Sequence, residues 1–349
     1  MSHPRTKGFA LFLFGMLAMA SGYLFIEYFR RPSGVTLPAA AYASILNIYS
    51  YFLLLLKGRV LAISFWCSIL LTLSLQYLFP AKPSQKIFSV SFAQDIVWFF
   101  YEMMLNALIL VFYVGCLTHF YHRYFSNLTV TSLSQSPGWI RFLLSLLLVD
   151  FLYWLQHYCH HKVPLLWRFH ALHHSQKELN FFTDFRYHFV EYVVRYTFLI
   201  VPFLMLKLDP PIIVAYVVFS TCYSHFYHGN IQTNLGPLKY VLVTPQSHRV
   251  HHSLESEHRD QNFGAILSLW DFMLGTQCKT FTVYPETGIA DAAFPHEQKI
   301  GLKSLLLTPL AQLLYPFSVM VRAYLSSPEP APVRIEAPSL ADGMHNADV

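Results

Sequence analysis

Eight histidines in three short clusters are the residues of this sequence most suited to chemistry. They follow the spacing HxxxH at His157 and His161, then HxxHH at residues 170–174 and again at residues 248–252. Residues three and four apart lie on one face of a helix, so each cluster can direct its imidazoles toward one point. Twelve of the 18 histidines lie within residues 157–252, although charged residues make up only 12% of the chain. The pattern predicts a metal site.

The number of histidines bears on how many ions the site would hold. Neutral imidazole binds zinc, copper, iron and nickel, so the residue type alone does not name the metal. One structural zinc takes about four ligands, and eight histidines therefore predict two ions. The HExxH motif of zinc proteases is missing from the sequence.

The composition predicts an integral membrane protein. The chain of 349 residues is 54% hydrophobic, with a mean hydropathy of +0.39. Its net charge of +5 is spread out, with no basic run interleaved with aromatic residues, so nothing supports a nucleic-acid partner. The five cysteines stand apart from one another without a CxxC pair, which argues against a disulfide framework or an iron–sulfur cluster.

Apolar runs at residues 9–29, 42–56, 60–79, 97–117 and 140–156 predict helices that cross or enter the membrane. For the first run a cleavable signal peptide is the alternative, which we disfavour because the run continues past the small residues that would suit cleavage. Residues 193–206 and 212–223 are each short of a full span and predict a re-entrant pair. The two prolines within residues 302–325 favour an interfacial helix there. The predicted fold is all-α, a polytopic helical bundle with a histidine-rich metal-binding cap on one membrane face.

Four segments are expected along the chain. Residues 1–90 would form N-terminal transmembrane helices and residues 91–280 the catalytic membrane domain. Residues 281–325 would form the apolar, interfacial segment. Residues 326–349 are dominated by proline, alanine and charged residues, which predicts a disordered tail. The polar residues 175–191 are expected outside the bilayer core or buried in protein near the metals.

Three stretches of the sequence resemble those of a known protein family. WRFHALHHS (167–175), TPQSHRVHHS (244–253) and RDQNFGAILSLWDFMLGT (259–276) resemble the fatty acid hydroxylase/sterol desaturase superfamily, whose membrane proteins share the pattern HxxxH, HxxHH and HxxHH. The resemblance covers roughly residues 95–280. It implies a non-haem oxygenase with two iron ions that hydroxylates or desaturates a lipid with O2 and two electrons.

The resemblance also implies a ligand set. It contains the eight clustered histidines and the histidine of the HGN sequence, namely His157, His161, His170, His173, His174, His228, His248, His251 and His252. His225 and His188 are further candidates, although Phe189 replaces the proline that usually follows the second of these in the family. No catalytic residue separate from the ligands is expected. His160 should lie on a helix surface, and four more histidines should lie at the membrane interface or on the surface, namely His119, His122, His258 and His296.

A metal-bound imidazole commonly donates its other N–H to a carboxylate or carbonyl. The groups available are Asp150, Asp184, Glu191, Asp260, Asn262 and Asp271. We favour Asp150, because it lies seven residues before His157, two turns away on the same helix face. An acid within a membrane helix is costly and suggests a function. We also favour Asn262, for its place in the NFG sequence.

The electrons would come from another protein. The sequence has no GxGxxG motif and no cysteine set for an iron–sulfur cluster, so a cytochrome b-type protein, a ferredoxin or a reductase is expected as the donor. The membrane would be the endoplasmic reticulum in a eukaryote or the inner membrane in a bacterium. Two alternatives remain, a histidine-lined metal transporter and an inactive scaffold; the second is disfavoured because all eight clustered histidines are present.

Overall fold

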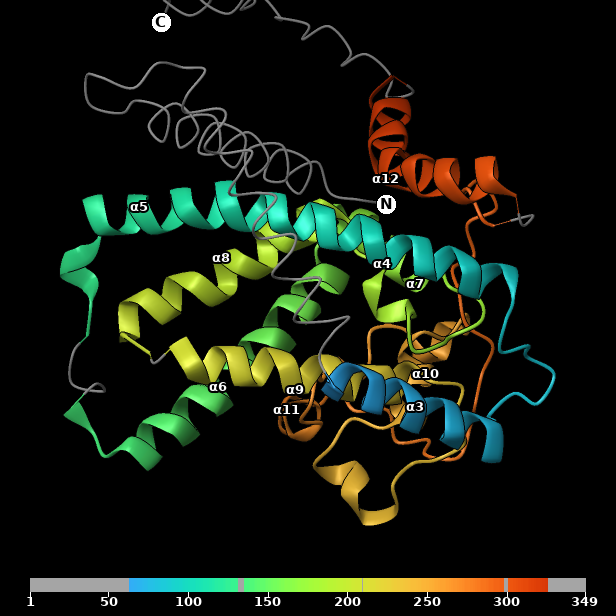
Figure 1. The fold of residues 1–349 in the computed structure, drawn as a ribbon, viewed down its shortest axis with the longest axis horizontal. Coiled ribbons are helices and arrows are strands. Elements are labelled where there is room, and N and C mark those ends of the chain that lie inside the picture. Colours follow the sequence, from blue (N-terminus) through green and yellow to red (C-terminus); the bar gives the residue numbers. More distant parts are fainter. Residues whose placement is uncertain (1–62, 131–134, 209, 298–300, 326–349) are drawn as a thin grey trace, which may run out of the picture.

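The computed structural model describes residues 63–130, 135–208, 210–297 and 301–325. Within these ranges the protein is all-helical, with no strand and three isolated β-bridges. The predicted helices at residues 9–29 and 42–56 and the predicted disordered tail lie outside the described residues. Figure 1 shows long helices that run roughly side by side, with short helices gathered near one end of them.

The long helices are those that the apolar runs predict. The longest starts with α4 (Val90–Ile109), continues through a π-helical turn, η1 (Leu110–Val114), and ends with α5 (Gly115–Tyr124). Ser89 caps its first turn by accepting the backbone N–H of Phe92. The remaining long helices are α3 (Ile63–Leu78), α6 (Gly138–Lys162), α8 (Phe189–Leu206), α9 (Pro210–His228) and α12 (Leu302–Leu325). The short elements are η2 (Ser126–Leu128), α7 (Pro164–His174), η4 (Thr183–Phe185), η5 (Gly236–Tyr240), α10 (Pro245–His251), η6 (Ser256–His258) and α11 (Leu269–Leu274).

Among the described residues, four helices are long and apolar enough to cross a membrane, by length and composition. They are the continuous α4–α5 helix (Val90–Tyr124), α6 (Gly138–Lys162), α8 (Phe189–Leu206) and most of α12 (Lys303–Leu325). The premise for a re-entrant pair is therefore wrong for α8, because this helix extends from Phe189 and, at 1.5 Å per residue, reaches roughly 27 Å. α12 contains Pro309 and Pro316 and is bent in Figure 1. Its interfacial placement stays a prediction.

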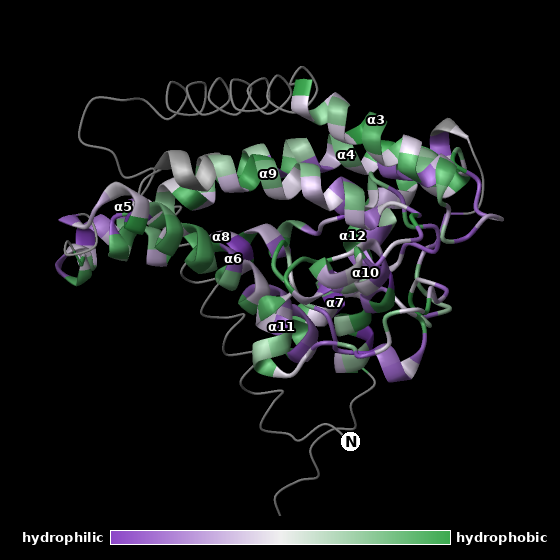
Figure 2. Ribbon diagram, turned by 90° about the horizontal axis from the view of Figure 1, so that it is seen from below, coloured by the Kyte–Doolittle hydropathy of each residue, from purple (hydrophilic) through white to green (hydrophobic). Residues whose placement is uncertain are grey.

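α6 occupies the centre of the packing, in contact with α7, α8 and α9, while α3 packs on α9 and α12 packs on α4. Figure 2 shows hydrophilic residues gathered around α7 and α10, while α8 is largely hydrophobic. The long helices therefore converge on a polar region built from the short ones.

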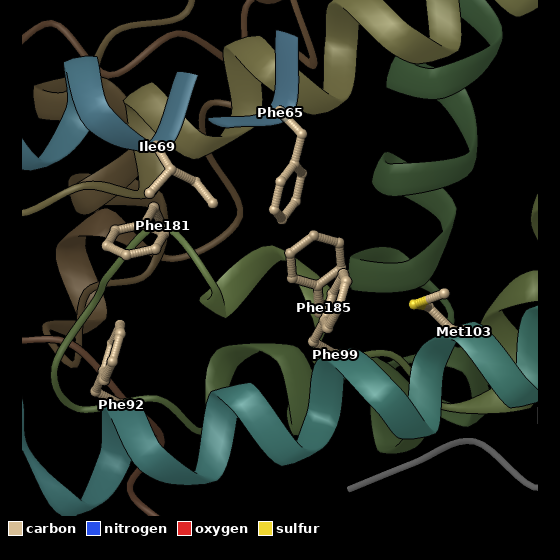
Figure 3. Packing of buried hydrophobic residues seen from close by; sticks show 7 residues of the cluster. All are labelled: Phe65, Ile69, Phe92, Phe99, Met103, Phe181 and Phe185. Atoms are coloured by element: carbon tan, nitrogen blue, oxygen red, sulfur yellow. The ribbon is translucent and has the colours of Figure 1, made fainter. Parts of the chain in front are cut away.

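An aromatic cluster holds α3 to α4 through the segment that follows α7. Its members are Phe65, Ile69, Phe92, Phe99, Met103, Phe181 and Phe185, and Figure 3 shows their side chains directed toward one another from these three elements. The rings of Phe99 and Phe185 lie 4.8 Å apart in an edge-to-face arrangement. Residues 181–185 are thereby fixed against the membrane helices.

A buried polar network holds the same segment from its other side. Asp95 accepts hydrogen bonds from Arg186, from Gln176 at 2.6 Å and from Asn180 at 2.7 Å. Arg186 also donates to Glu297 at 2.6 Å. Both Asp95 and Arg186 are fully buried. The polar residues 175–191 are therefore largely buried in protein, which is one of the two placements that the sequence predicts.

Replacing Asp95 with Asn should destabilise the fold strongly, because it leaves the buried charge of Arg186 without its main partner. We expect a loss of about 3–5 kcal/mol in the free energy of unfolding, measured by denaturation in detergent. The control is Glu286→Gln, which removes the exposed pair that Lys82 and Glu286 form at 2.5 Å and should cost at most about 1 kcal/mol. Equal effects of the two substitutions would contradict the structural role given to Asp95.

Candidate metal centre

Nine histidines meet in two groups at the polar end of the bundle. The first histidine group contains His157, His161, His170, His174 and His251, and the second histidine group contains His173, His228, His248 and His252. Within each group the ligating nitrogens all lie within 4.8 Å of one another. The two groups together hold every histidine of the ligand set that the resemblance implies, so the structure brings all nine together.

Short helices with strong start signals position most of these imidazoles. α7 begins at Pro164, which suits the first helical position because proline lacks the N–H that would be unpaired there. α10 also begins with a proline, and Thr244 and Ser247 cap it reciprocally. α10 is only seven residues long, so these caps and the packing around it hold its helical form. Each short helix then presents its histidines at the predicted three- and four-residue spacing.

The distances between the imidazoles fit metal binding. The Nε2 atoms of His157 and His170 lie 3.1 Å apart in the first group, and those of His228 and His248 lie 2.8 Å apart in the second. Two nitrogens bound at right angles to one ion, at roughly 2.1 Å each, would lie roughly 3 Å apart. The buried Nε2 of His251 has no hydrogen-bond partner among the described residues. A metal ion in each group would satisfy these nitrogens.

Hydrogen bonds on the outer side fix which nitrogen points inward. In the first group, Nδ1–H of His170 donates to Glu191 at 2.6 Å and Nδ1–H of His157 donates to the carbonyl of Phe263 at 2.9 Å. In the second, Nδ1–H of His228 donates to the carbonyl of Ser224 at 3.0 Å. An imidazole that donates through Nδ1 keeps its lone pair on Nε2, the form in which it ligates a metal.

Burial keeps the imidazoles of α7 and α10 uncharged. It lowers the pKa of His170, His173 and His174 well below the usual value, and nearby imidazoles lower it further. The same causes lower the pKa of His248 and His252, again with burial as the larger. Because metal ions compete with protons for the imidazole nitrogen, these lowered values favour metal binding.

The loop that contains the NFG sequence supports the first group from outside. Asp260 and Asn262 adopt left-handed backbone conformations, with φ of 60° and 59°. Between them, the carbonyl of Gln261 accepts a hydrogen bond of 2.7 Å from Nδ1–H of His251. A Cβ at Gly264 would lie 2.7 Å from the carbonyl oxygen of Leu267, so only glycine fits there. The loop therefore directs a backbone acceptor at His251.

Asp271 holds this loop in place. It accepts the backbone N–H groups of Phe263 at 2.9 Å and Gly264 at 2.8 Å, and the indole N–H of Trp154 at 2.9 Å. Because Trp154 belongs to α6, the loop is tied to the helix that carries His157 and His161.

The two favoured supporting residues do not contact an imidazole. Asp150 accepts hydrogen bonds from Tyr216 at 2.6 Å and Trp270 at 2.8 Å, so it joins α6 to α9 and to α11. Asn262 donates to the carbonyl of Ser247 at 2.9 Å, beside His248, and so acts on α10 through its backbone. These contacts give no support to the prediction of Asp150 as a partner of a candidate ligand, since its seven-residue spacing places it about 10 Å along α6 from His157.

Glu191 and Asp260 are carboxylates that lie against histidines of the first group. Glu191 contacts His170 as described above, and Asp260 lies 3.5 Å from Nδ1 of His161. Contact with His161, together with the hydrogen bond from Lys162, lowers the pKa of Asp260 to about 2. Glu191 is the only acid within residues 189–206, which is the signal that could have singled it out. Both carboxylates serve the first histidine group.

The two further ligand candidates lie outside both groups. His188 caps α8, accepting the backbone N–H of Val190 at 3.1 Å through Nδ1, and its Nε2–H donates to the carbonyl of Leu313 at 3.0 Å. Nδ1 of His225 lies 2.8 Å from the hydroxyl of Ser68 in α3, and its ring packs on Phe65. Their assignment as ligands is therefore not supported.

Two histidines expected on the surface are buried. His160 is 1% exposed, and the centroid of its ring lies 5.2 Å from that of His170. His258 is 4% exposed and lies 3.0 Å from the hydroxyl of Ser253. Polar partners and neighbouring rings cover them, which spacing along the sequence does not reveal. His119 and His122 are exposed and His296 is partly exposed, as expected.

Two cavities reach the histidines from different sides. The first, about 170 Å³ in volume, lies between α6, α8 and α9 and meets His157, His170, His173, His228 and His248. The second, about 500 Å³, meets His161, His174 and His251. Its other walls include Trp167, whose ring lies 5.0 Å from that of His161.

Comparison with known proteins identifies the segment that carries these histidines. The family model described as fatty acid hydroxylase matches residues 142–276. This segment is a fatty acid hydroxylase domain. The match confirms the resemblance to this superfamily, and the domain contains all nine grouped histidines.

Several curated relatives of the fatty acid hydroxylase domain are lipid oxygenases by name. Human alkylglycerol monooxygenase is 33% identical over 128 residues, which are 37% of this chain and 28% of the relative. The same enzyme of Xenopus tropicalis is 33% identical over 133 residues, 38% of this chain and 29% of the relative. Ornithine lipid hydroxylase OlsE of Rhizobium tropici is 30% identical over 184 residues, 53% of this chain and 52% of the relative. The chain thus spans between about a quarter and a half of the length of these relatives, and no solved structure matches it significantly.

Replacing Glu191 with Gln should weaken metal binding at the first histidine group. Gln keeps the oxygen that accepts the backbone N–H of His188 at 2.9 Å, so the cap of α8 can persist, but it removes the charge beside His170. Loss of such a partner typically lowers metal affinity about 10- to 100-fold, measurable by competition with a chelator.

The matched control for this test is Glu286→Gln. Glu286 is exposed, pairs with Lys82 and belongs to no group of possible metal ligands, so this change should leave the chelator competition unaltered. Unchanged metal retention in Glu191→Gln would contradict the role assigned to Glu191.

Proposed function

We propose that the protein is a membrane-bound di-iron oxidoreductase that hydroxylates or desaturates a lipid with O2 and electrons from a separate donor. The observation that carries this proposal is the convergence of nine imidazoles into two adjacent groups at one end of a membrane-type helical bundle. When bound there, two iron ions would supply the activation of O2 and the one-electron chemistry that oxidation of a C–H bond requires.

The donor set suits two ions of this kind. The first histidine group would hold one ion through five imidazoles and the second would hold the other through four. Imidazole suits iron, whereas the thiolates that favour copper(I) or iron–sulfur clusters are missing from both groups. All five cysteines are free, and none is a member of either group.

The protein side of the reaction consists of binding and orientation. The cavity between α6, α8 and α9 brings a substrate against five of the nine histidines. Nδ1–H hydrogen bonds to Glu191 and to the carbonyls of Gln261, Phe263 and Ser224 hold the imidazoles in place. The helices around the cavity limit the access of water to it.

A metal transporter is less well supported by this geometry. A transport path needs ionisable residues at successive depths of the membrane. Here the imidazoles gather at the C-terminal ends of α6 and α9 and in the short helices α7 and α10, in one centre. The names of the relatives, which are lipid monooxygenases and hydroxylases, also favour the oxygenase.

Replacing His173 or His251 with Ala should abolish iron loading of the affected group and stop turnover, while the protein stays in the membrane. The two residues belong to different groups, so each change should remove about one iron ion per chain, as measured by elemental analysis of the purified protein. His119→Ala, a change at an exposed histidine outside both groups, should retain both ions. Full lipid oxidation by either of the first two variants would refute the ligand assignment.

The reaction itself is tested by comparing the lipids of cells with and without the protein. The proposal expects a lipid that gains one oxygen atom or loses two hydrogen atoms, and only when the histidines are intact. Mass spectrometry of whole lipid extracts detects either change in any lipid, so the substrate need not be chosen beforehand. Exchangeable zinc in the purified protein and metal flux into vesicles, with no altered lipid, would favour the transporter instead.

A further inference from the structure

The cavity beside the histidines is polar close to them and apolar farther away. On α8, Glu191, Arg195 and Leu199 line it in succession, and on α9 His228, Ser224, Ser220 and Val217 do the same. Residues four apart are separated by roughly 6 Å along a helix axis. A polar layer therefore lies between the histidines and an apolar layer formed by Leu199, Ile200 and Val217.

Arg195 is the cation of this polar layer. Its guanidinium carbon lies 4.3 Å from the ring centroid of Tyr187, 5.3 Å from that of Tyr192 and 5.6 Å from that of Tyr153. Tyr187 in turn stacks on His173, with 5.1 Å between ring centroids and an interplanar angle of 9°. A single tyrosine ring thus separates Arg195 from the second histidine group.

The guanidinium of Arg195 forms no ion pair with an acid in the described part of the chain, although its charge acts on Glu191 one turn away. Its Nε is buried and makes no hydrogen bond. Glu191, one turn earlier, is engaged with His170 and with the backbone of His188. Glu102 accepts from Tyr192 at 2.6 Å, and Asp184 accepts from Tyr187 at 3.4 Å. The three acids that line the cavity are thus directed to other groups.

A partly buried arginine that forms no ion pair with a described acid is costly, and within a membrane protein such a residue usually marks a binding site. Contacts with aromatic rings offset part of that cost. A guanidinium also offers a rigid set of donors that matches the paired oxygens of a carboxylate or phosphate. An anionic oxygen group that enters the cavity would therefore bind the guanidinium of Arg195.

We propose that the substrate is a lipid with an anionic oxygen group, a carboxylate or a phosphate, which Arg195 binds beside the histidines while the hydrocarbon chain extends toward Leu199, Ile200 and Val217. This inference rests on the proposed function, because it assumes that the cavity is where the substrate binds. It narrows the substrate class from lipids in general to lipids with a negatively charged group.

The test measures lipid binding to the purified, metal-loaded full-length protein in a neutral detergent. The probes are two matched pairs, oleate with methyl oleate and dioleoyl phosphatidate with dioleoylglycerol. The wild-type protein should bind the charged member of at least one pair about 10- to 100-fold more tightly, as expected for a charge-assisted hydrogen bond. The pair that shows the preference tells a carboxylate from a phosphate.

Replacing Arg195 with Gln should bring the charged and neutral members of the pair to nearly equal affinity, and Arg195→Lys should retain part of the preference. The control is Arg168→Gln, which removes a cation of α7 that lies outside the cavity lining and should keep the full preference. A variant that has lost its metal is treated as misfolded. In that case the relative affinity of the wild-type protein for charged and neutral lipids decides the test. Equal binding of charged and neutral lipids by the wild type, or a preference that survives in Arg195→Gln, would overturn the inference.

The assay separates this inference from the proposed function because it measures binding and not oxidation. A wild-type protein that oxidises a lipid but binds both members of each pair equally refutes the role of Arg195 alone. A wild-type protein that prefers charged lipids but holds no iron and oxidises none refutes the oxygenase and leaves an anionic-lipid site.

Discussion

The orientation of the imidazoles is the constraint on which the rest of the structure depends. If the two groups are to hold metal ions as proposed, nine lone pairs must point inward at two places, and each imidazole must stay uncharged in order to offer one. Outward hydrogen bonds such as that of His170 to Glu191 and that of His251 to the carbonyl of Gln261 select the tautomer. Much of the surrounding structure positions these acceptors. The left-handed residues Asp260 and Asn262 and the loop bonds of Asp271 turn backbone carbonyls toward the histidines.

The sequence predicts the parts of the centre that depend on helix periodicity. The three- and four-residue spacings place the histidines of α6, α7 and α10 correctly, because a helix fixes the relation between such residues. The family resemblance adds His228, which spacing does not reach. The apolar runs likewise predict the long helices that the structure describes. α8 is longer than its apolar run, because the helix also includes a first turn that contains Glu191.

What the sequence does not predict are contacts between elements. Asp150 shares a helix face with His157, yet that face meets α9 and residues 266–270 at the depth of Asp150. Glu191 is 21 residues from His170 and reaches it only because α8 packs on α7. His225 is three residues before His228, but the hydroxyl of Ser68 in α3 lies against it. In each case the partner is set by how two helices pack, which a single sequence does not specify.

The two histidine groups differ in their surroundings, and the difference follows from where the supporting residues lie. Among the described residues, the carboxylates in contact with a grouped histidine, Glu191 and Asp260, both serve the first group, so an ion there would experience the more electron-rich imidazoles. In the second group, Nδ1 of His173, His248 and His252 lacks a hydrogen-bond partner among the described residues. This group has one imidazole fewer, and three of its four histidines face the cavity that contains Arg195. Two of the five histidines of the first group, His157 and His170, also line this cavity. The other three, His161, His174 and His251, line the separate cavity beside Trp167. In the proposed function the lipid approaches through the cavity with Arg195. Two ions held in these groups would therefore be chemically distinct.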